Sequence, residues 1–212
     1  MEPVRDIVGV VLAGGQSRRM GGGDKTLKLL AGKTILQHVI DRVRPQVATL
    51  ILNANGDSSR FSDYGAAIVP DSVEGFAGPL AGILAGMEWA AKNAPACTWL
   101  ASFAADAPFL SKDLVRCLHQ AVVTAGASLA CARSGGRAHP VFGLWPLGLR
   151  GDLRRALVDE DMRKIDLWTS RYSLVHVDFS TQPIDPFFNI NRPEDLDAAE
   201  SVVSCRRALS SL

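Results

Sequence analysis

Short apolar runs alternate with amphipathic stretches along most of this chain. Residues 7–12 are apolar and mainly β-branched at successive positions, which is typical of a strand buried on both faces. After a glycine-rich loop, apolar residues recur at helical spacing from Ile35 to Val43. Thr34 and Gln37 have the spacing of a capping box, in which each side chain satisfies a backbone amide of the first turn. This part of the chain therefore predicts a strand, a loop and a helix.

The alternation continues to the end of the chain. Further strands are expected over residues 49–53, 66–69, 98–104, 128–132, 141–144 and 174–179, the last with the alternation of an edge strand. Four further helices are expected: one that begins at Leu80, one that Ser111 caps, one over residues 149–158, and one that begins at Pro193. Two acids follow Pro193, near the positive end of the helix dipole. Strands that alternate with helices predict a mostly parallel α/β sheet, and the length fits one domain over residues 1–212. Binding sites in such folds lie at the carboxyl ends of strands.

Composition and charge exclude several classes of protein. The chain has 212 residues with 23 Lys and Arg against 22 Asp and Glu, which gives a formal net charge of +1. Its 47% hydrophobic content excludes a disordered or collagen-like chain, and the balanced charge argues against a general nucleic-acid coat or a polybasic membrane binder. The four cysteines form no CxxC pair, and the first apolar run is too short and wrongly flanked for a signal peptide. We therefore expect reduced thiols, a cytoplasmic location, and neither nucleic acid nor membrane as a partner.

The loop after the first expected strand carries the most informative chemistry. Residues 12–25 read LAGGQSRRMGGGDK and include five glycines, which let backbone amides approach an anion closely. Residues 18–33 contain five basic side chains and one acid, so their local charge is +4. The loop has neither the spacing of a Walker A motif nor that of the dinucleotide-binding GxGxxG motif. A triphosphate is the ligand that such a basic, glycine-rich loop would suit.

This loop resembles the LAGGxSxRMGxDK signature of the molybdenum cofactor guanylyltransferases, with one additional glycine before Asp24. The resemblance covers nearly the whole chain. It implies a three-layer, Rossmann-like fold of the GT-A type, with the nucleotide at the N-terminal part and molybdopterin at the C-terminal part. It also implies transfer of GMP from GTP to the phosphate of molybdopterin or Mo-molybdopterin, which releases pyrophosphate and forms the guanine dinucleotide form of the molybdenum cofactor.

The resemblance assigns roles to individual residues of the loop. Lys25 and Arg19 would stabilise the charge that builds on pyrophosphate. The other loop residues at the nucleotide would be Leu12, Ala13, Gly14, Gly15 and Gly22. Gly14 favours guanine, because the related cytidylyltransferase typically carries alanine at this position.

Later segments of the chain also match the family's nucleotide site. Asn53 and Asp71 each follow an expected strand and would contact the nucleotide, although both also fit ordinary turn chemistry. Gly78 and Pro79 begin a GPLAG segment that would hold guanine and ribose mainly through the backbone. The resemblance thus places the nucleoside among these residues.

Asp106 is the expected metal ligand. The apolar strand before it would deliver its carboxylate to the carboxyl edge of the sheet. Mg²⁺ commonly takes one or two carboxylates together with phosphates and water, so the implied cofactor is Mg²⁺. Alanine stands at position 105 where the family usually has cysteine, and a helix-capping role is the alternative for Asp106.

The C-terminal third carries the residues that the resemblance places near molybdopterin. His139 lies in a His-Pro pair and would approach the second substrate, with an ordinary loop histidine as the alternative. Asn189 and Asn191 alternate in the stretch FNINRPED, so an extended backbone would point both to one side. Their amides both donate and accept hydrogen bonds, which suits the edge of a pterin. Capping of the following helix is the alternative for Asn191.

Several alternatives remain open at this point. The same loop is compatible with a CTP-dependent transfer to the same acceptor, with sugar-1-phosphate nucleotidyl transfer, and with a non-catalytic nucleotide-binding module of the same fold. The three acids at residues 159–161 suggest a cation site, but neighbouring arginines and a lysine favour a solvated helix surface. Besides GTP and molybdopterin, the resemblance implies transient contacts with a molybdenum-insertion protein and with molybdoenzyme chaperones.

Overall fold

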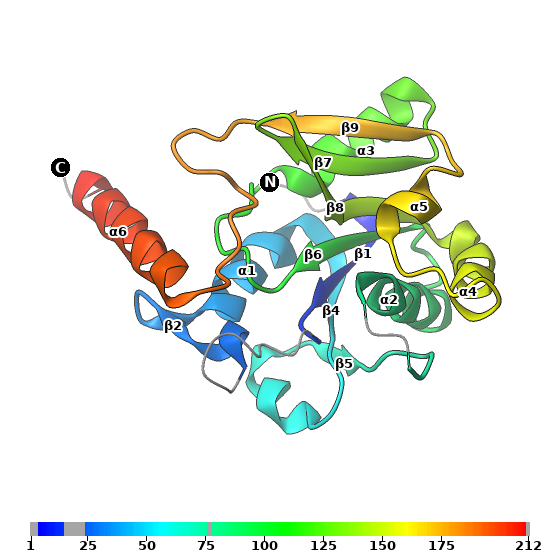
Figure 1. Cartoon of the computed structure of the whole chain (residues 1–212), viewed down its shortest axis with the longest axis horizontal. Helices are drawn as coiled ribbons and strands as arrows, with labels where there is room; N and C mark the ends of the chain where they lie inside the picture. Colours follow the sequence, from blue (N-terminus) through cyan, green and yellow to red (C-terminus); the bar gives the residue numbers. More distant parts are fainter. Residues whose placement is uncertain (1–3, 15–23, 76–77, 211–212) are drawn as a thin grey trace.

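A mixed sheet of seven strands forms the centre of the molecule, in the order β5-β4-β1-β6-β8-β7-β9 (Figure 1). The computed structural model describes residues 4–14, 24–75 and 78–210. The strands are β1 (Val4–Leu12), β4 (Val47–Asn53), β5 (Ala67–Val69), β6 (Trp99–Ala104), β7 (Leu129–Ser134), β8 (Arg137–Pro146) and β9 (Leu174–Phe179). Every pair of neighbours is parallel except those that include β8, which runs antiparallel to β6 and β7. The predicted, mostly parallel α/β sheet is confirmed, and β9 is an edge strand as expected.

Helices cover both faces of this sheet (Figure 1). They are α1 (Ile35–Val43), α2 (Pro79–Asn93), α3 (Leu114–Ala125), α4 (Arg150–Val158), α5 (Ile165–Thr169) and α6 (Pro193–Ser210), with short 3-10 helices η1 (Lys25–Leu27), η2 (Arg44–Gln46), η3 (Ser58–Tyr64) and η4 (Leu147–Leu149). The apolar faces of α1 and α3 pack into one buried cluster, and those of α2, α4 and α5 pack into another. The expected three-layer architecture is therefore confirmed.

The register of the central strands aligns their carboxyl ends. Leu12, the last residue of β1, lies opposite Asn53 of β4 and Ala104 of β6, and Asn53 in turn lies opposite Val69 of β5. The loops that follow these four strands therefore leave the sheet at one level. This shared edge is where ligands bind in parallel α/β folds.

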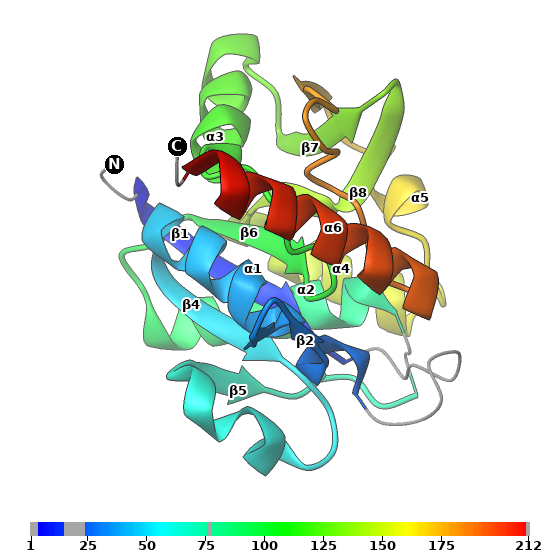
Figure 2. The ribbon, with the colours of Figure 1, turned by 90° about the vertical axis from the view of Figure 1, so that its left-hand side faces the viewer.

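The C-terminal part of the chain returns to this edge from the far side of the sheet. Residues 180–192, which we call the strap, lead from β9 back to α6 (Figure 1). Figure 2 looks onto α6, which packs over the hairpin formed by β2 (Leu29–Leu30) and β3 (Lys33–Thr34). A third buried cluster joins these elements through Leu30, Ile35, Phe109, Ile190 and Ala199. The backbone amide of Ala31 also donates a 2.7 Å hydrogen bond to Glu200 of α6.

Two expected helix caps differ in detail from the structure. The Thr34 hydroxyl accepts a hydrogen bond from the Gln37 amide at 3.1 Å, but the Gln37 side chain donates to Asp41, so only half of the capping box forms. Ser111 does not cap α3, because the helix begins after Asp113, whose amide donates to the Ser111 hydroxyl at 3.2 Å. Ser111 therefore shapes the turn that leads into the helix.

Some elements were absent from the sequence prediction or longer than expected. The β2–β3 hairpin turns at Ala31 and Gly32, whose φ angles are +50° and +85°, as in a type I′ turn. The strand expected over residues 141–144 is the longer β8, and α5 was not predicted because it is short. Among the described residues, no helix is long and apolar enough to cross a membrane.

Two glycines of α2 allow this helix to lie against the sheet. A Cβ at Gly82 would come within 2.3 Å of Asn53 Oδ1 and 2.8 Å of Leu12 Cδ2, whereas one at Gly86 would meet Leu100 and Val10 at 3.2 Å. The first contact is a clash, and the second requires only a small adjustment of the neighbours. The position of α2 at the carboxyl edge therefore depends on Gly82.

Substitution of these two glycines tests the close approach. We expect Gly82→Ala to lower the free energy of unfolding by about 1–3 kcal/mol, since overpacking displaces Asn53 and Leu12. We expect Gly86→Ala to change it by less than about 1 kcal/mol, because the gain in helix propensity offsets a milder contact. Urea denaturation of both variants measures the difference, and equal stabilities would contradict this packing.

Candidate functional site

Backbone hydrogen bonds at the carboxyl edge join the loop after β1 to the end of β4, and the loop after β6 to the end of β1. The Ala13 amide donates to the Asn53 carbonyl at 2.8 Å, and the Ala105 amide donates to the Leu12 carbonyl at 3.3 Å. Gly14 follows directly and is exposed. The predicted nucleotide residues Leu12, Ala13 and Gly14 therefore lie beside Asn53 and next to the segment that carries Asp106.

Lys25 and Asp106 form the central contact of this edge. The Lys25 ammonium lies 2.6 Å from Asp106 Oδ2, and the two side chains are only 17% and 14% exposed. The same ammonium donates to Asn191 Oδ1 at 2.7 Å. The Ile190 amide donates to the Asp106 carbonyl at 2.9 Å. Three segments that are far apart in the sequence, including the strap, therefore meet at one lysine.

The second carboxylate oxygen of Asp106 has no hydrogen-bond partner in the part of the chain that the structure describes. Oδ1 is buried, and no hydrogen bond reaches it from the residues that the structure describes. A buried acceptor without a donor is costly unless a ligand satisfies it. Within the described ranges, no group of three or more His, Cys, Asp or Glu side chains could hold a metal ion. A cation at Asp106 would therefore take most of its ligands from phosphate and water, as Mg²⁺ commonly does.

A second polar cluster holds Asp71. Asn53, which is 4% exposed, donates from Nδ2 to Asp71 Oδ1 at 2.9 Å and to the Val69 carbonyl at 3.1 Å. Asn55 donates to Asp71 Oδ2 at 2.8 Å and accepts from the Asp71 amide at 2.9 Å. Asn55 was not among the site residues predicted from the sequence. Its spacing of two from Asn53 at the end of an extended strand was the available signal.

Arg60 of η3 links the two clusters, a role that no local pattern in the sequence predicted. Its guanidinium donates to Asp24 Oδ2 at 3.3 Å and to the Asn55 carbonyl at 3.1 Å. Asp24 caps η1, since Oδ1 accepts hydrogen bonds from the Thr26 amide and hydroxyl at 3.1 and 2.7 Å. Arg60 thus ties the start of the segment that carries Lys25 to the loop that carries Asn55.

The GPLAG segment begins α2 at the same edge. Gly78 is the N-cap residue and Pro79 is the first helical residue, as expected from the fixed φ of proline. The Ala81 amide donates to the Gly78 carbonyl at 3.2 Å. Because Gly82 lies directly against Asn53, the first turn of α2 is adjacent to the Asp71 cluster.

The predicted molybdopterin-side residues divide between two places. Asn191 contacts Lys25, and Asn189 is exposed on the strap. The capping alternative for Asn191 is not what the structure shows, because Asp195 Oδ2 accepts hydrogen bonds from the amides of Asn191 and Arg192 at 2.8 and 2.9 Å. The Asn191 side chain is therefore available to the site.

His139 belongs to a separate polar cluster. Its Nε2 lies 2.8 Å from the Ser134 hydroxyl, which is itself 2.9 and 3.0 Å from the two carboxylate oxygens of Asp185 on the strap. The imidazole ring packs against Phe187 with ring centroids 4.6 Å apart. Burial lowers the pKa of His139 below its usual value, although the charge of Asp185 acts in the opposite direction. These contacts join His139 to the strap.

Three predicted site residues are not placed. Gly15, Arg19 and Gly22 lie outside the described residues, so their expected contacts with phosphate stay predictions.

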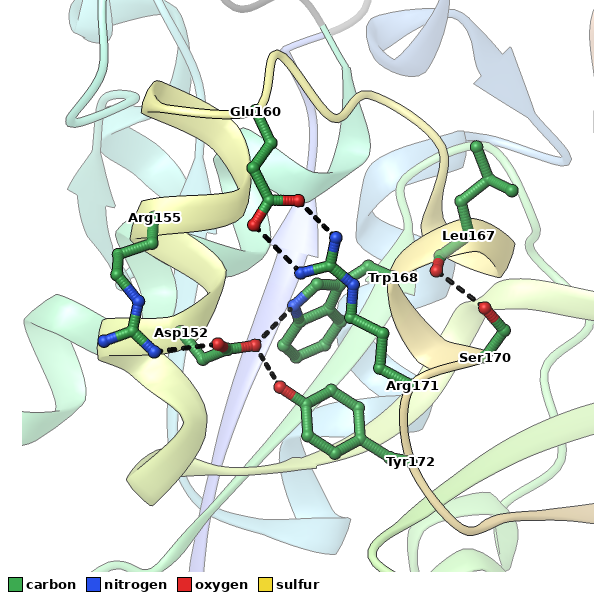
Figure 3. A network of polar contacts seen from close by, with 8 residues as sticks. All are labelled: Asp152, Arg155, Glu160, Leu167, Trp168, Ser170, Arg171 and Tyr172. Atoms are coloured by element: carbon green, nitrogen blue, oxygen red, sulfur yellow. Dashed lines mark hydrogen bonds and ion pairs between the residues drawn. The ribbon is translucent and has the colours of Figure 1, made fainter.

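The acids at residues 159–161 follow α4, and two of them are paired with arginines. Figure 3 shows one of these pairs, Glu160 with Arg171. Glu160 pairs with Arg171, and Asp161 Oδ1 accepts from Arg163 at 2.9 and 3.0 Å. The three acids lie at the end of α4 and in the loop after it, and not on the helix surface that the sequence suggested. The pairing of two of them with arginines agrees with the interpretation that they do not form a cation site.

The same region contains a hydrogen-bonded junction between α4, α5 and the segment before β9 (Figure 3). Asp152 accepts from Tyr172 and, at 3.3 Å, from Trp168 Nε1. Hydrogen bonding from Tyr172 lowers the pKa of Asp152, whereas burial and this carboxylate raise the pKa of Tyr172 to about 12. The junction thus joins α4 to α5, which pack together with α2 in one buried cluster.

Comparison with known proteins identifies the family. A model described as the MobA-like NTP transferase domain matches residues 9–172. A molybdenum cofactor guanylyltransferase from Bradyrhizobium sp. (strain ORS 278) is 54% identical over 198 residues, which cover 93% of each chain. One from Nitrobacter hamburgensis is 54% identical over 196 residues, which cover 92% of this chain and 94% of that one.

A solved structure agrees with these relatives. Molybdopterin-guanine dinucleotide biosynthesis protein A from Archaeoglobus fulgidus superposes with a TM-score of 0.73 at 25% identity, covering 93% of this chain and 98% of that one. The resemblance seen in the loop after β1 is confirmed. The chain belongs to the MobA-like NTP transferases and, within them, to the molybdenum cofactor guanylyltransferases.

Proposed function

We propose that this protein transfers GMP from GTP to the terminal phosphate of molybdopterin or Mo-molybdopterin. The observation that carries the proposal is the partly buried Lys25–Asp106 pair, in which one carboxylate oxygen faces no protein donor among the described residues. A phosphate oxygen of the acceptor attacks the α-phosphorus of GTP, the bond from that phosphorus to the bridging oxygen of the β-phosphate breaks, and pyrophosphate leaves. The attacking group is already an anion, so no side chain has to act as a nucleophile or base.

The lysine and the carboxylate have complementary roles in this reaction. Asp106 would hold Mg²⁺ through its free oxygen, and the bound ion would supply charge neutralisation on the phosphates. Lys25 places a positive charge beside that carboxylate, where it can stabilise negative charge on the leaving pyrophosphate. Positioning and electrostatic stabilisation therefore provide most of the catalysis.

The two remaining parts of the site orient the substrates. We assign the nucleoside to the cluster of Asn53 and Asp71 together with the start of α2 at Gly78 and Pro79, which lies beside the exposed backbone of Gly14. We assign the acceptor to the strap, where Asn191 contacts Lys25 and Asn189 is exposed. The expected transient contacts with a molybdenum-insertion protein and molybdoenzyme chaperones stay predictions.

Removal of the Asp106 carboxylate tests the proposed activity. We expect Asp106→Ala to lower Mg²⁺-dependent pyrophosphate release from GTP and molybdopterin by at least about 100-fold, because charge on the phosphates loses its counter-charge. Binding of molybdopterin and the far-UV circular dichroism spectrum should persist. Asp166→Ala, which removes an exposed carboxylate from α5, is the matched control and should have wild-type activity. Normal Mg²⁺-dependent turnover by Asp106→Ala would overturn the assignment.

Substitution of Gly14 tests the choice of guanine over cytosine. A Cβ at Gly14 would lie 3.7 Å from Asn55 Nδ2 and 3.9 Å from Asn53 Oδ1, which are ordinary contacts, so the protein itself tolerates alanine there. We expect Gly14→Ala to unfold at the wild-type temperature and to reduce transfer from GTP relative to CTP by about tenfold, as one methyl group in a fitted pocket does. Pyrophosphate release with GTP and CTP gives the ratio for both proteins. A wild-type preference for CTP would instead support the cytidylyltransferase alternative.

A further inference from the structure

The hydrogen bonds around Ser134 have only one consistent direction. A carboxylate accepts and does not donate, so the single Ser134 hydroxyl proton goes to Asp185, at 2.9 and 3.0 Å from its two oxygens. The contact at 2.8 Å between Ser134 Oγ and His139 Nε2 must then be donated by the imidazole. Ser134 is 3% exposed, so the middle of this link from β8 through β7 to the strap is shielded from water.

The strap is fixed at this point by both polar and aromatic contacts. Asp185 Oδ1 also accepts from the Phe187 amide at 2.9 Å, which turns the backbone of the strap. The Phe187 ring, 4% exposed, packs against His139, Phe142 and Phe179 with centroid distances of 4.6, 4.9 and 5.5 Å. The aromatic contacts pack the strap against the sheet. The hydrogen bonds fix its orientation, because a hydrogen bond forms only when donor and acceptor are aligned.

The other end of the same short segment reaches the site. Ile190 is fully buried and its amide donates to the Asp106 carbonyl at 2.9 Å. Asn191 accepts from the Lys25 ammonium at 2.7 Å, and the exposed Asn189 lies between these two anchored regions. A shift of the strap at Asp185 would therefore be transmitted to both asparagines.

We propose that Ser134, His139 and Asp185 are positioning residues, which fix the strap so that Asn189 and Asn191 meet the acceptor beside Lys25. Among them, His139 acts through Ser134 and Phe187 and does not contact the substrate. This inference rests on the proposed function, because it assigns the strap to the acceptor. According to this inference, His139 does not take part in the chemical step and affects only the binding of molybdopterin.

Four substitutions separate positioning from packing and from chemistry. Ser134→Ala removes the link, and His139→Phe keeps a ring against Phe187 but removes the Nε2 donor. Asp185→Asn keeps the Oδ1 oxygen, which can accept from both the Ser134 hydroxyl and the Phe187 amide, and is the conservative variant. Arg133→Ala is the control from the same strand, because Arg133 pairs with Asp178 in an exposed ion pair.

The kinetic test distinguishes the two substrates. We expect Ser134→Ala and His139→Phe each to raise the KM for molybdopterin by about tenfold, as the loss of one buried hydrogen bond does. The Kd for GTP should change by less than about twofold. Asp185→Asn and Arg133→Ala should remain close to wild type. An equal rise in the GTP Kd, or an unchanged KM for molybdopterin, would overturn the proposal. A large loss of kcat confined to His139→Phe would show instead that the histidine contacts the substrate.

Hydrogen exchange tests the positioning without any turnover. The Ile190 amide should exchange about tenfold faster in Ser134→Ala than in wild type, while Arg133→Ala leaves it unchanged, because the anchor at Asp185 limits local opening of the strap. Unchanged exchange at Ile190 and Phe187 in Ser134→Ala would contradict the proposal. If wild-type protein shows no transfer from GTP, the proposed function fails, and these exchange rates still decide whether the cluster holds the strap.

Discussion

The ion pair between Lys25 and Asp106 is the interaction on which the arrangement of the site depends. It brings the segment after the glycine-rich loop onto the loop after β6, and through Asn191 it also fixes the strap. Both side chains are mostly shielded from water, so removal of one partner leaves an uncompensated charge in a poorly solvated place. A triphosphate with its cation would meet each of the two charges with a group of opposite sign.

The sheet makes this pair possible because its central strands end at one level. The loops after β1, β4 and β6 emerge side by side, and α2 closes against them through Gly82. The Asp71 cluster, to which we assign the nucleoside, is held by Asn53 and Asn55, and the strap, to which we assign the acceptor, is held at its other end by Asp185. This separation suits a reaction in which two bound substrates are aligned and no covalent intermediate is needed.

Much of this arrangement could be predicted from local patterns in the sequence. The strand before the loop, the proline that opens α2 and the carboxylate after β6 all have local signals, and the structure places them as expected. The β2–β3 hairpin was missed because Ala31-Gly32 lacks the Asn-Gly or Asp-Gly signature of its turn. Ser134 and Asp185 were missed because their contact joins residues 51 positions apart, which no local pattern encodes.

The effect of the local charge of +4 in residues 18–33 could not be predicted without the structure, because it depends on which side chains pair with these residues. The ammonium of Lys33 lies 2.7 Å from Asp41 on α1, so it does not contribute an unpaired charge to the edge of the sheet. Lys25 is paired with an acid from another part of the chain, and Asp24 with Arg60. Counting charges along the sequence singled out this loop, but the partners of Lys25 and Asp24 come from distant segments.

A double-mutant cycle on Lys25 and Asp106 tests the central claim most directly. Lys25→Met, Asp106→Asn and the double variant are compared with wild type in the rate of GMP transfer from GTP to molybdopterin. If the two residues act as one unit, the double variant loses activity to within about threefold of the more severe single variant. Losses that multiply, as for two independent residues, would contradict the account.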